Sequence, residues 1–171
     1  MKFIKHKKYS NCMRLRKFLL KDTKALQNLF LNEKNLKDTG VNVNHNKITL
    51  KFMRDWLKER IEAPNSKNPS SIVYAIINNK NNIIGTIGLG NINYKSKSAF
   101  IGYWISEKYS GKGNCTFAIK IFLEKIPKLF DLKKITSEVS EKNIASYKVL
   151  KKNSFKVRKK LKGNLLLEKE L

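Results

Sequence analysis

The sequence predicts a mixed α/β (α+β) fold with a mostly antiparallel sheet and one parallel βαβ crossover. Three observations favour this class. The predicted elements follow the order β-α-α-β-β-β-α-β-α-β-β, two pairs of strands are joined by short polar turns, and one strand turns directly into an amphipathic helix that leads to a further strand. With 171 residues, 41% of them hydrophobic, the chain suits one domain with a single core.

The first half of the chain is predicted to contain a strand, two helices and a hairpin. After a basic tail at residues 1–12, residues 13–18 alternate apolar and basic side chains as a half-buried strand does. Asp22 is expected to cap a first helix, and residues 49–61 to form a second. Residues 42–47 and 64–71 are expected loops, and strands at 72–77 and 83–89 flank the polar turn 78–82. The apolar faces of the two helices are expected at Ala25, Leu26, Leu29 and Phe30, and at Phe52, Met53, Trp56 and Leu57.

The second half is predicted to supply the crossover and a closing hairpin. A strand at 99–105 ends in the polar turn 106–114, and a helix follows. A strand at 132–140, a helix at 143–153, and strands at 155–161 and 165–171 complete the pattern. No linker or repeat interrupts it, so residues 13–171 are expected to form one domain. The apolar residues at helical spacing after the turn are Cys115, Ala118, Ile119, Phe122, Leu123 and Ile126.

The formal charge of +24 would ordinarily favour an anionic partner such as nucleic acid or a membrane surface. The charge is not localised, however. Residues 1–90 carry 18 basic and 6 acidic side chains and residues 91–171 carry 19 and 7, so each half has a charge of +12. The bias of 32 Lys against 5 Arg, together with 19 Asn, is also what an AT-rich genome would encode. Two basic stretches without acidic residues, 1–17 and 142–162, are the candidates for an anion-binding surface beyond cofactor binding, with an ordinary solvated surface as the alternative.

Cysteine and histidine usage argues against a metal centre or a disulfide framework. Cys12 and Cys115 lie far apart without a CxxC motif, and His6 and His45 have no ligand-like spacing to them. Cys115 is expected to be a small buried residue. No segment approaches 18 apolar residues, so a cytoplasmic protein without a membrane partner is expected.

The turn at residues 107–114 carries the most specific signal. Gly111 and Gly113 open a helix directly after a strand, so main-chain N–H groups and the positive end of the helix dipole point to one place. Such a turn suits a pyrophosphate, and Lys108 and Lys112 can add positive charge. Neither GxxxxGK[ST] nor GxGxxG is present. A glycine-rich helix start without a ligand is the alternative.

Three motifs of the sequence are informative together. They are Ile101-Gly-Tyr-Trp-Ile105, the turn Lys108-x-x-Gly111-x-Gly113, and Asn143-Ile-Ala-Ser146 followed by Val149-Leu150. Together they resemble the GNAT acetyltransferases, and in particular their ribosomal-protein-alanine acetyltransferase (RimJ/RimL-like) branch. This resemblance implies a GNAT-type twisted sheet with helices on both faces and acetyl-CoA as co-substrate. The chain departs from the branch pattern at Phe117, Asn114 and Ser154.

The resemblance also implies roles for individual residues. The coenzyme A pyrophosphate would lie against Lys108, Tyr109, Ser110, Gly111, Lys112, Gly113 and Asn114. The pantetheine arm would bind the strand end at Trp104 and Ile105 and face Asn143, for which an ordinary helix cap is the alternative.

Two residues are the candidates for proton transfer. Many GNAT enzymes place a tyrosine acid where this chain has Leu150, and Ser146 is the candidate acid of the branch, with a packing role as the alternative. Because the attacking amine must be unprotonated, a carboxylate or a water chain must accept a proton; Glu138 and Glu107 are the nearby carboxylates, and Glu138 is the favoured candidate base. Strand alternation places it opposite Ser137 and Val139, and an exposed Glu paired with a lysine is the alternative.

The expected activity is therefore metal-free transfer of an acetyl group to a primary amine by direct attack. The acceptor can be a protein N-terminus, with ribosome association, or a small amine such as an amino sugar. Polyamines are disfavoured by the positive surface. The chain is expected to act as a monomer or a homodimer. The competing hypothesis is a non-catalytic basic RNA- or ribosome-binding module on an acetyltransferase scaffold.

Overall fold

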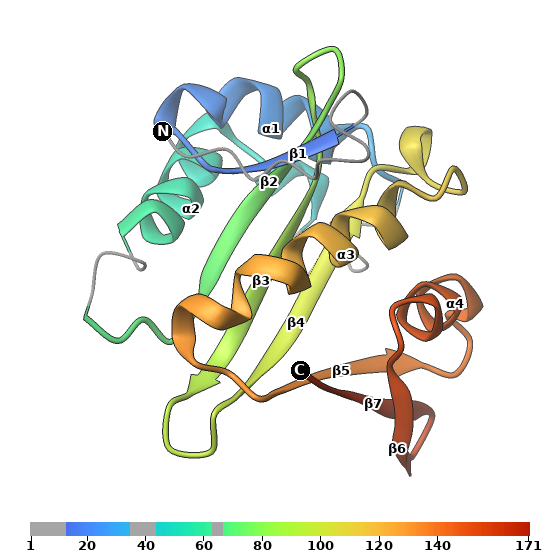
Figure 1. The fold of residues 1–171 in the computed structure, drawn as a ribbon. Helices are drawn as coiled ribbons and strands as arrows, with labels where there is room; N and C mark the ends of the chain where they lie inside the picture. The colour runs from blue at the N-terminus through green and yellow to red at the C-terminus, as the bar shows by residue number, and fades with distance from the viewer. Residues whose placement is uncertain (1–12, 35–43, 63–66) are drawn as a thin grey trace.

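The computed structural model describes residues 13–34, 44–62 and 67–171, which form one seven-stranded sheet covered by helices (Figure 1). The strand order is β1-β2-β3-β4-β5-β7-β6, so β1 and β6 are the edges. The strands are β1 (Met13–Lys17), β2 (Ile72–Asn78), β3 (Ile83–Asn93), β4 (Ser98–Ile105), β5 (Lys134–Ser140), β6 (Lys156–Leu161) and β7 (Asn164–Glu170).

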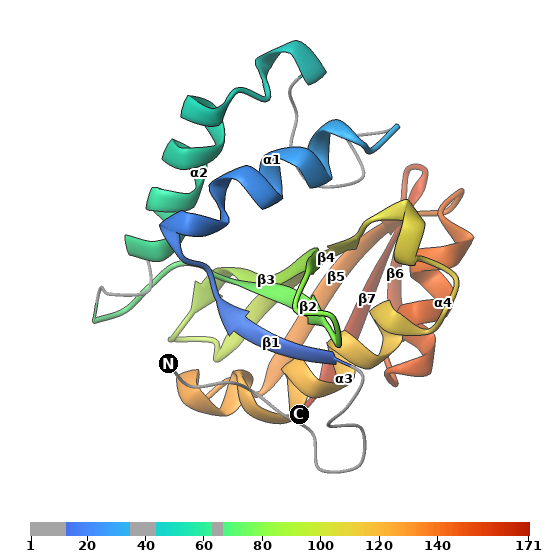
Figure 2. The same cartoon turned by 90° about the horizontal axis from the view of Figure 1, so that it is seen from above.

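Helices lie on both faces of the sheet (Figure 2). One face is covered by α1 (Thr23–Leu31) and α2 (Leu50–Glu62), and the other by α3 (Asn114–Lys125) and α4 (Ile144–Lys152). Short 3-10 helices occur at η2 (Leu20–Asp22), η4 (His45–Lys47), η6 (Glu107–Tyr109) and η7 (Pro127–Phe130). Each face has its own hydrophobic core. Leu26, Phe30 and Trp104 belong to the core between the sheet and α1 and α2, and Ile101, Phe122 and Leu150 belong to the core between the sheet and α3 and α4.

The sheet topology confirms the predicted fold class and the predicted order of elements. Every neighbouring pair of strands is antiparallel except β4 and β5, which are parallel and connected through α3. That crossover brings the turn before α3 and the start of α4 to the same end of β4 and β5. It is the feature of the fold that positions the site.

Alternation within the strands sets which side chains face which helices. In β5, Ser137 and Val139 are buried and Glu138 between them is exposed, as predicted. In β4, Ile101 and Ile105 belong to the core under α3, while Trp104 belongs to the core under α1 and stacks on Phe30 with ring centroids 5.0 Å apart. Neighbouring β4 residues therefore serve opposite faces.

Two local predictions about α1 need correction. Asp22 is the N-cap residue of α1, as predicted, but its side chain makes no capping hydrogen bond. Its buried carboxylate instead binds Arg16 at 2.6 and 2.8 Å and accepts the Leu19 N–H at 2.8 Å, because a buried arginine requires a counter-charge. Ala25 is exposed, and Gln27 is buried in the inner face, where its amide donates to the Ile48 carbonyl at 2.9 Å.

Other predictions fall partly outside the described residues. The basic tail at 1–12, including His6 and Cys12, lies outside them, as do parts of the predicted loops. The described part of the loop 42–47 contains the short η4 helix. In the described ranges, no helix is long and apolar enough to span a bilayer.

Candidate functional site

A gap opens in the sheet where β4 and β5 separate. Their parallel pairing covers only Ser98 to Phe100 against Lys134 to Thr136. Further along, the Ser137 hydroxyl still donates to the Ile101 carbonyl at 3.2 Å, and no pairing follows. Gly102 lies next to this gap and is exposed, although β4 is a central strand. A Cβ built on it would meet no atom within 4 Å, so the gap is open on the face that carries α1 and α2.

The free main-chain edge of β4 belongs to Tyr103 and Ile105. The Ile101 carbonyl faces β5, whereas a Cβ built on Gly85 of β3 would lie 2.1 Å from the Trp104 carbonyl oxygen. Because successive residues of a strand direct their main-chain groups to opposite sides, Tyr103 and Ile105 face the gap and Trp104 faces β3. Of the two predicted strand residues, Ile105 is therefore placed to bind an extended ligand, and Trp104 is placed in the core.

The turn between β4 and α3 is built around its own hydrogen bonds. The Tyr109 N–H donates to the Ser106 carbonyl at 2.8 Å, and the Ser110 N–H and hydroxyl both donate to the Glu107 carbonyl, at 3.1 and 2.9 Å. The Asn114 amide then donates to the Tyr109 carbonyl at 2.9 Å. These contacts hold the turn in shape and use side chains that the sequence assigned to cofactor binding.

Both glycines of the turn have conformations that other residues rarely adopt. Gly111 has a φ of 71° and Gly113 a φ of 78°. Gly113 is the N-cap of α3, and this cap contributes no side-chain hydrogen bond. The N–H groups of the first helical turn therefore remain without a side-chain cap, and a Cβ at either glycine would project into open space. An exposed, uncapped helix start with this shape fits a phosphate group.

The two lysines of the turn, Lys108 and Lys112, are exposed. Lys108 lies 5.9 Å above the Tyr109 ring, and the Lys112 ammonium donates to the Lys108 carbonyl at 3.4 Å. Their side chains can contribute charge to an anion, but the main-chain groups provide the fixed geometry.

Ser146 is brought against a tyrosine that sequence analysis missed. The Tyr103 hydroxyl lies 2.7 Å from the Ser146 Oγ and 3.3 Å from the Ser146 carbonyl, across the gap from β4 to α4. Burial raises the pKa of the Tyr103 phenol, and the hydrogen bond with Ser146 partly opposes this. Strand alternation was the available signal, because it places Tyr103 opposite Trp104 and toward the second motif helix.

Asn143 caps α4, which was the alternative prediction for this residue. Its Oδ1 accepts the Ser146 N–H at 2.9 Å, so Asn143 fixes the first turn of the helix that carries Ser146. The amide nitrogen of the same side chain is not used in this cap. Leu150, at the position of the usual tyrosine acid, is fully buried.

Glu138 lies on the other side of the sheet from Ser146. Its carboxylate accepts a hydrogen bond from the Asn164 amide at 2.7 Å, and no ion pair joins it to a lysine of the described residues. The candidate base and the candidate acid therefore flank the gap from opposite faces.

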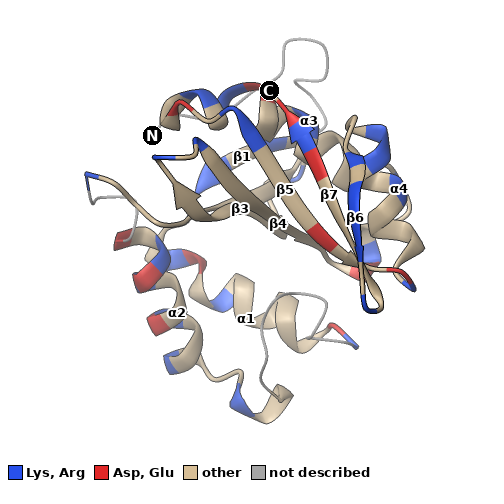
Figure 3. Cartoon of the chain, turned by 90° about the horizontal axis from the view of Figure 1, so that it is seen from below, with Lys and Arg blue, Asp and Glu red and all other residues tan. Residues whose placement is uncertain are grey.

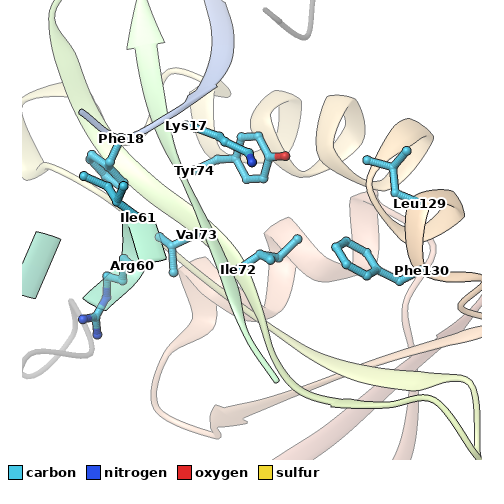
Figure 4. Close-up of a pocket in the computed structure, with 9 residues that line it drawn as sticks. All are labelled: Lys17, Phe18, Arg60, Ile61, Ile72, Val73, Tyr74, Leu129 and Phe130. Atoms are coloured by element: carbon cyan, nitrogen blue, oxygen red, sulfur yellow. The ribbon is translucent and has the colours of Figure 1, made fainter. Parts of the chain in front are cut away.

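Cys115, in the first turn of α3, packs with Tyr103 against the core on that face of the sheet. Burial raises the pKa of the Cys115 thiol to about 12, and the described residues contain no group of three potential metal ligands. A cavity of about 160 Å³ lies beside β2, where Arg60 and Ile61 of α2 approach from one side and Leu129 and Phe130 from the other (Figure 4). It contains none of the predicted site residues.

Proteins of known structure share this fold. RimL, a ribosomal L7/L12 alpha-N-protein acetyltransferase solved with coenzyme A, is 19% identical with a TM-score of 0.84, over 99% of this chain and 98% of that one. The ribosomal-protein-S5-alanine acetyltransferase from Vibrio fischeri is 20% identical with a TM-score of 0.82, over 92% of each chain. The microcin C7 self-immunity acetyltransferase MccE, solved with acetyl-CoA and AMP, is 18% identical with a TM-score of 0.78, over 94% and 93%.

The chain thus has the same fold as the RimL and RimJ structures. Residues 13–156 match the acetyltransferase (GNAT) domain family, and the chain belongs to that family. The predictions of the family, of an acetyltransferase and of acetyl-CoA as co-substrate are confirmed. No curated protein matches the sequence significantly.

Proposed function

We propose that this acetyltransferase moves the acetyl group of acetyl-CoA to a primary amine by direct attack across the gap between β4 and β5. One observation carries the proposal: Glu138 and the Ser146–Tyr103 hydroxyl pair flank that gap from opposite faces of the sheet. An amine can then attack from one side while the thiolate departs on the other.

The co-substrate is held mainly by main-chain groups. Its pyrophosphate binds the uncapped start of α3 at residues 108–114, with Lys108 and Lys112 adding charge. Its extended arm pairs with the free edge of β4 at Tyr103 and Ile105, as an added strand would. Asn143 faces this arm and orients Ser146 through the helix cap.

The proton balance follows from the same arrangement. The amine nitrogen forms a bond to the thioester carbonyl carbon, the carbon–sulfur bond breaks, and one proton leaves the nitrogen while one reaches the sulfur. Glu138 accepts the first proton, directly or through water. The Ser146 hydroxyl donates the second proton to the departing sulfur and regains one from solvent, while its oxygen is hydrogen-bonded to Tyr103.

For the acceptor we favour a protein N-terminal amine over a small amine. The fold likeness to RimL, named for a ribosomal protein acceptor, supports this choice. The nine Lys and Arg of the stretch 142–162 are all exposed and support association with an anionic assembly such as the ribosome, in the cytoplasm. The enzyme is proposed to act as a monomer or a homodimer.

Glu138→Gln tests the chemistry, and Glu141→Gln is the matched control on an exposed neighbour. We expect Glu138→Gln to lower kcat by about 10–100-fold at neutral pH with little change in acetyl-CoA affinity. The loss should shrink as pH rises, because hydroxide in the solvent can then accept the proton that leaves the amine nitrogen in place of Glu138. A deficit that is the same at every pH would refute the role of Glu138.

An acetylation screen across peptides with varied N-termini, amino sugars and diamines tests the acceptor. Acetyl transfer to peptide N-termini is the expected result. Salt-sensitive RNA binding with no transfer to any amine would instead favour the non-catalytic RNA-binding hypothesis.

A further inference from the structure

We propose that Glu33 is a positioning residue for the coenzyme A turn, a role that rests on the proposed assignment of residues 108–114. Glu33 follows the end of α1 and is only 6% exposed. Its Oε2 and Oε1 accept the main-chain N–H of Glu107 at 3.2 and 3.3 Å. Glu107 is the first residue of η6, from which the chain enters the turn.

Glu33 is itself held from several directions. Its N–H donates to the Phe30 carbonyl at 3.1 Å, and its carbonyl lies 2.6 Å from the His45 Nε2. Phe30 stacks on Trp104 of β4, so the end of α1 is fixed against the same strand that leads to the turn. The carboxylate therefore acts from a rigid position.

The residue that Glu33 contacts is a fixed point of the turn. The Glu107 N–H is bound by Glu33, and the Glu107 carbonyl is bound by both the N–H and the hydroxyl of Ser110. Gly111 follows directly after Ser110. A shift of the Glu107 peptide would thus be transmitted to the main-chain N–H groups that receive the pyrophosphate.

Within the described residues, no ion pair explains the burial of the Glu33 carboxylate. Lys34, its neighbour, is exposed and lies 3.8 Å from the Glu107 carboxylate instead. No lysine, arginine or histidine of the described residues forms an ion pair with Glu33. A buried carboxylate without a cation is costly, and a hydrogen bond from a main-chain N–H offsets this cost only at a fixed geometry. That geometry is what a positioning residue supplies.

Isothermal titration of coenzyme A into matched variants tests the role. Glu33→Ala removes the acceptor, and we expect it to weaken coenzyme A binding about tenfold, the size of one hydrogen bond to a charged group. Glu33→Gln keeps an acceptor oxygen and should stay within about twofold of the wild type. Lys34→Ala, which removes only the exposed ion pair, should do the same. In kinetics, Glu33→Ala should raise KM for acetyl-CoA more than it lowers kcat.

Wild-type affinity in folded Glu33→Ala would overturn the proposal, and so would a Glu33→Gln variant as weak as Glu33→Ala. If Glu33→Ala does not fold, Glu33→Asp replaces it in the experiment. Because its side chain is shorter, the Glu33→Asp variant should bind coenzyme A more weakly than the Glu33→Gln variant. Equal affinity of these two variants would overturn the proposal. Gly113→Val is titrated in parallel. If Gly113→Val also leaves affinity unchanged, the turn is not the coenzyme A site; if only the Glu33 variants do so, the positioning role alone fails.

Discussion

Ser146 and Tyr103 form a hydroxyl pair 2.7 Å apart at the gap in the sheet. A serine hydroxyl alone is a weak acid. When the serine donates its proton to a thiolate, negative charge is left on the serine oxygen, and a second hydroxyl that donates a hydrogen bond to that oxygen stabilises the charge. Tyr103 is too deeply buried to ionise readily, because burial raises the pKa of its phenol. At neutral pH it is therefore a neutral hydrogen-bond donor, and in the proposed mechanism Ser146 is the group that acts on the leaving thiolate.

Ser146→Ala should lower kcat by roughly 10–100-fold and leave acetyl-CoA affinity nearly unchanged, because the hydroxyl acts on the leaving thiolate. Alanine preserves helix propensity, so thermal stability should hold. Steady-state kinetics and coenzyme A titration measure both effects. Tyr147→Phe is the control, since Tyr147 is the next residue but points to another side of the helix. A silent Ser146→Ala beside a damaging Tyr147→Phe would mean that the acid is misassigned.

Tyr103→Phe should lower kcat by about 3–10-fold, less than Ser146→Ala, because Tyr103 acts through the serine. The Tyr103→Phe/Ser146→Ala double variant should then be no slower than Ser146→Ala alone, since the partner is already lost. A double variant whose loss equals the product of the single losses would show that the two hydroxyls act independently.

The turn before α3 is the element on which co-substrate binding depends. Gly111 and Gly113 hold positive φ angles, and neither would bring a Cβ against another protein atom. Replacing either glycine by another residue should therefore cost about 1–2 kcal/mol of backbone strain, but the new side chain would not clash with other atoms of the protein. The space in front of these glycines is available to a ligand.

Gly113→Val should abolish measurable coenzyme A binding while the domain stays folded, because the branched side chain occupies the approach to the helix start. Gly111→Val should behave in the same way. Titration calorimetry measures the affinity, and circular dichroism confirms the fold. Retained affinity in both variants would remove the turn from the binding site.

Lys108→Ala and Lys112→Ala should weaken coenzyme A binding by about 0.5–2 kcal/mol each, because the main-chain donors remain. Both side chains are exposed, which keeps their contribution modest and sensitive to salt. Titration at low and high ionic strength measures this. A loss as large as that of the glycine variants would assign the binding to side-chain charge instead.

At the scale of the whole molecule, positive charge is distributed over both faces and both edges of the sheet. Figure 3 shows Lys and Arg along β6 and α4 and on β1, while α2 carries Lys and Arg together with Asp and Glu. Mutual repulsion within a chain of formal charge +24 opposes the compact state.

Adding salt should therefore stabilise the protein. Raising NaCl from about 20 to 300 mM shortens the screening length severalfold and should raise Tm by several degrees. Scanning fluorimetry measures the shift, with an equal osmolality of sucrose as the control for solvent effects. A Tm that falls with salt would show that specific surface ion pairs, such as Lys97 with Asp131, outweigh the overall repulsion.

The amino-acid sequence by itself determined the order of elements, the single parallel crossover and the turn that opens α3. These depend on local periodicity and on turn residues such as Gly113, whose backbone requirements act within a few positions. Only the tertiary structure decided the partners of individual side chains. The Asp22 carboxylate binds Arg16 and not the first N–H groups of α1, Tyr103 meets Ser146 across 43 positions, and Glu33 reaches Glu107 across 74. Such contacts depend on how the elements pack and on which face of a strand meets which helix. A local sequence pattern does not encode contacts between residues so far apart in the chain.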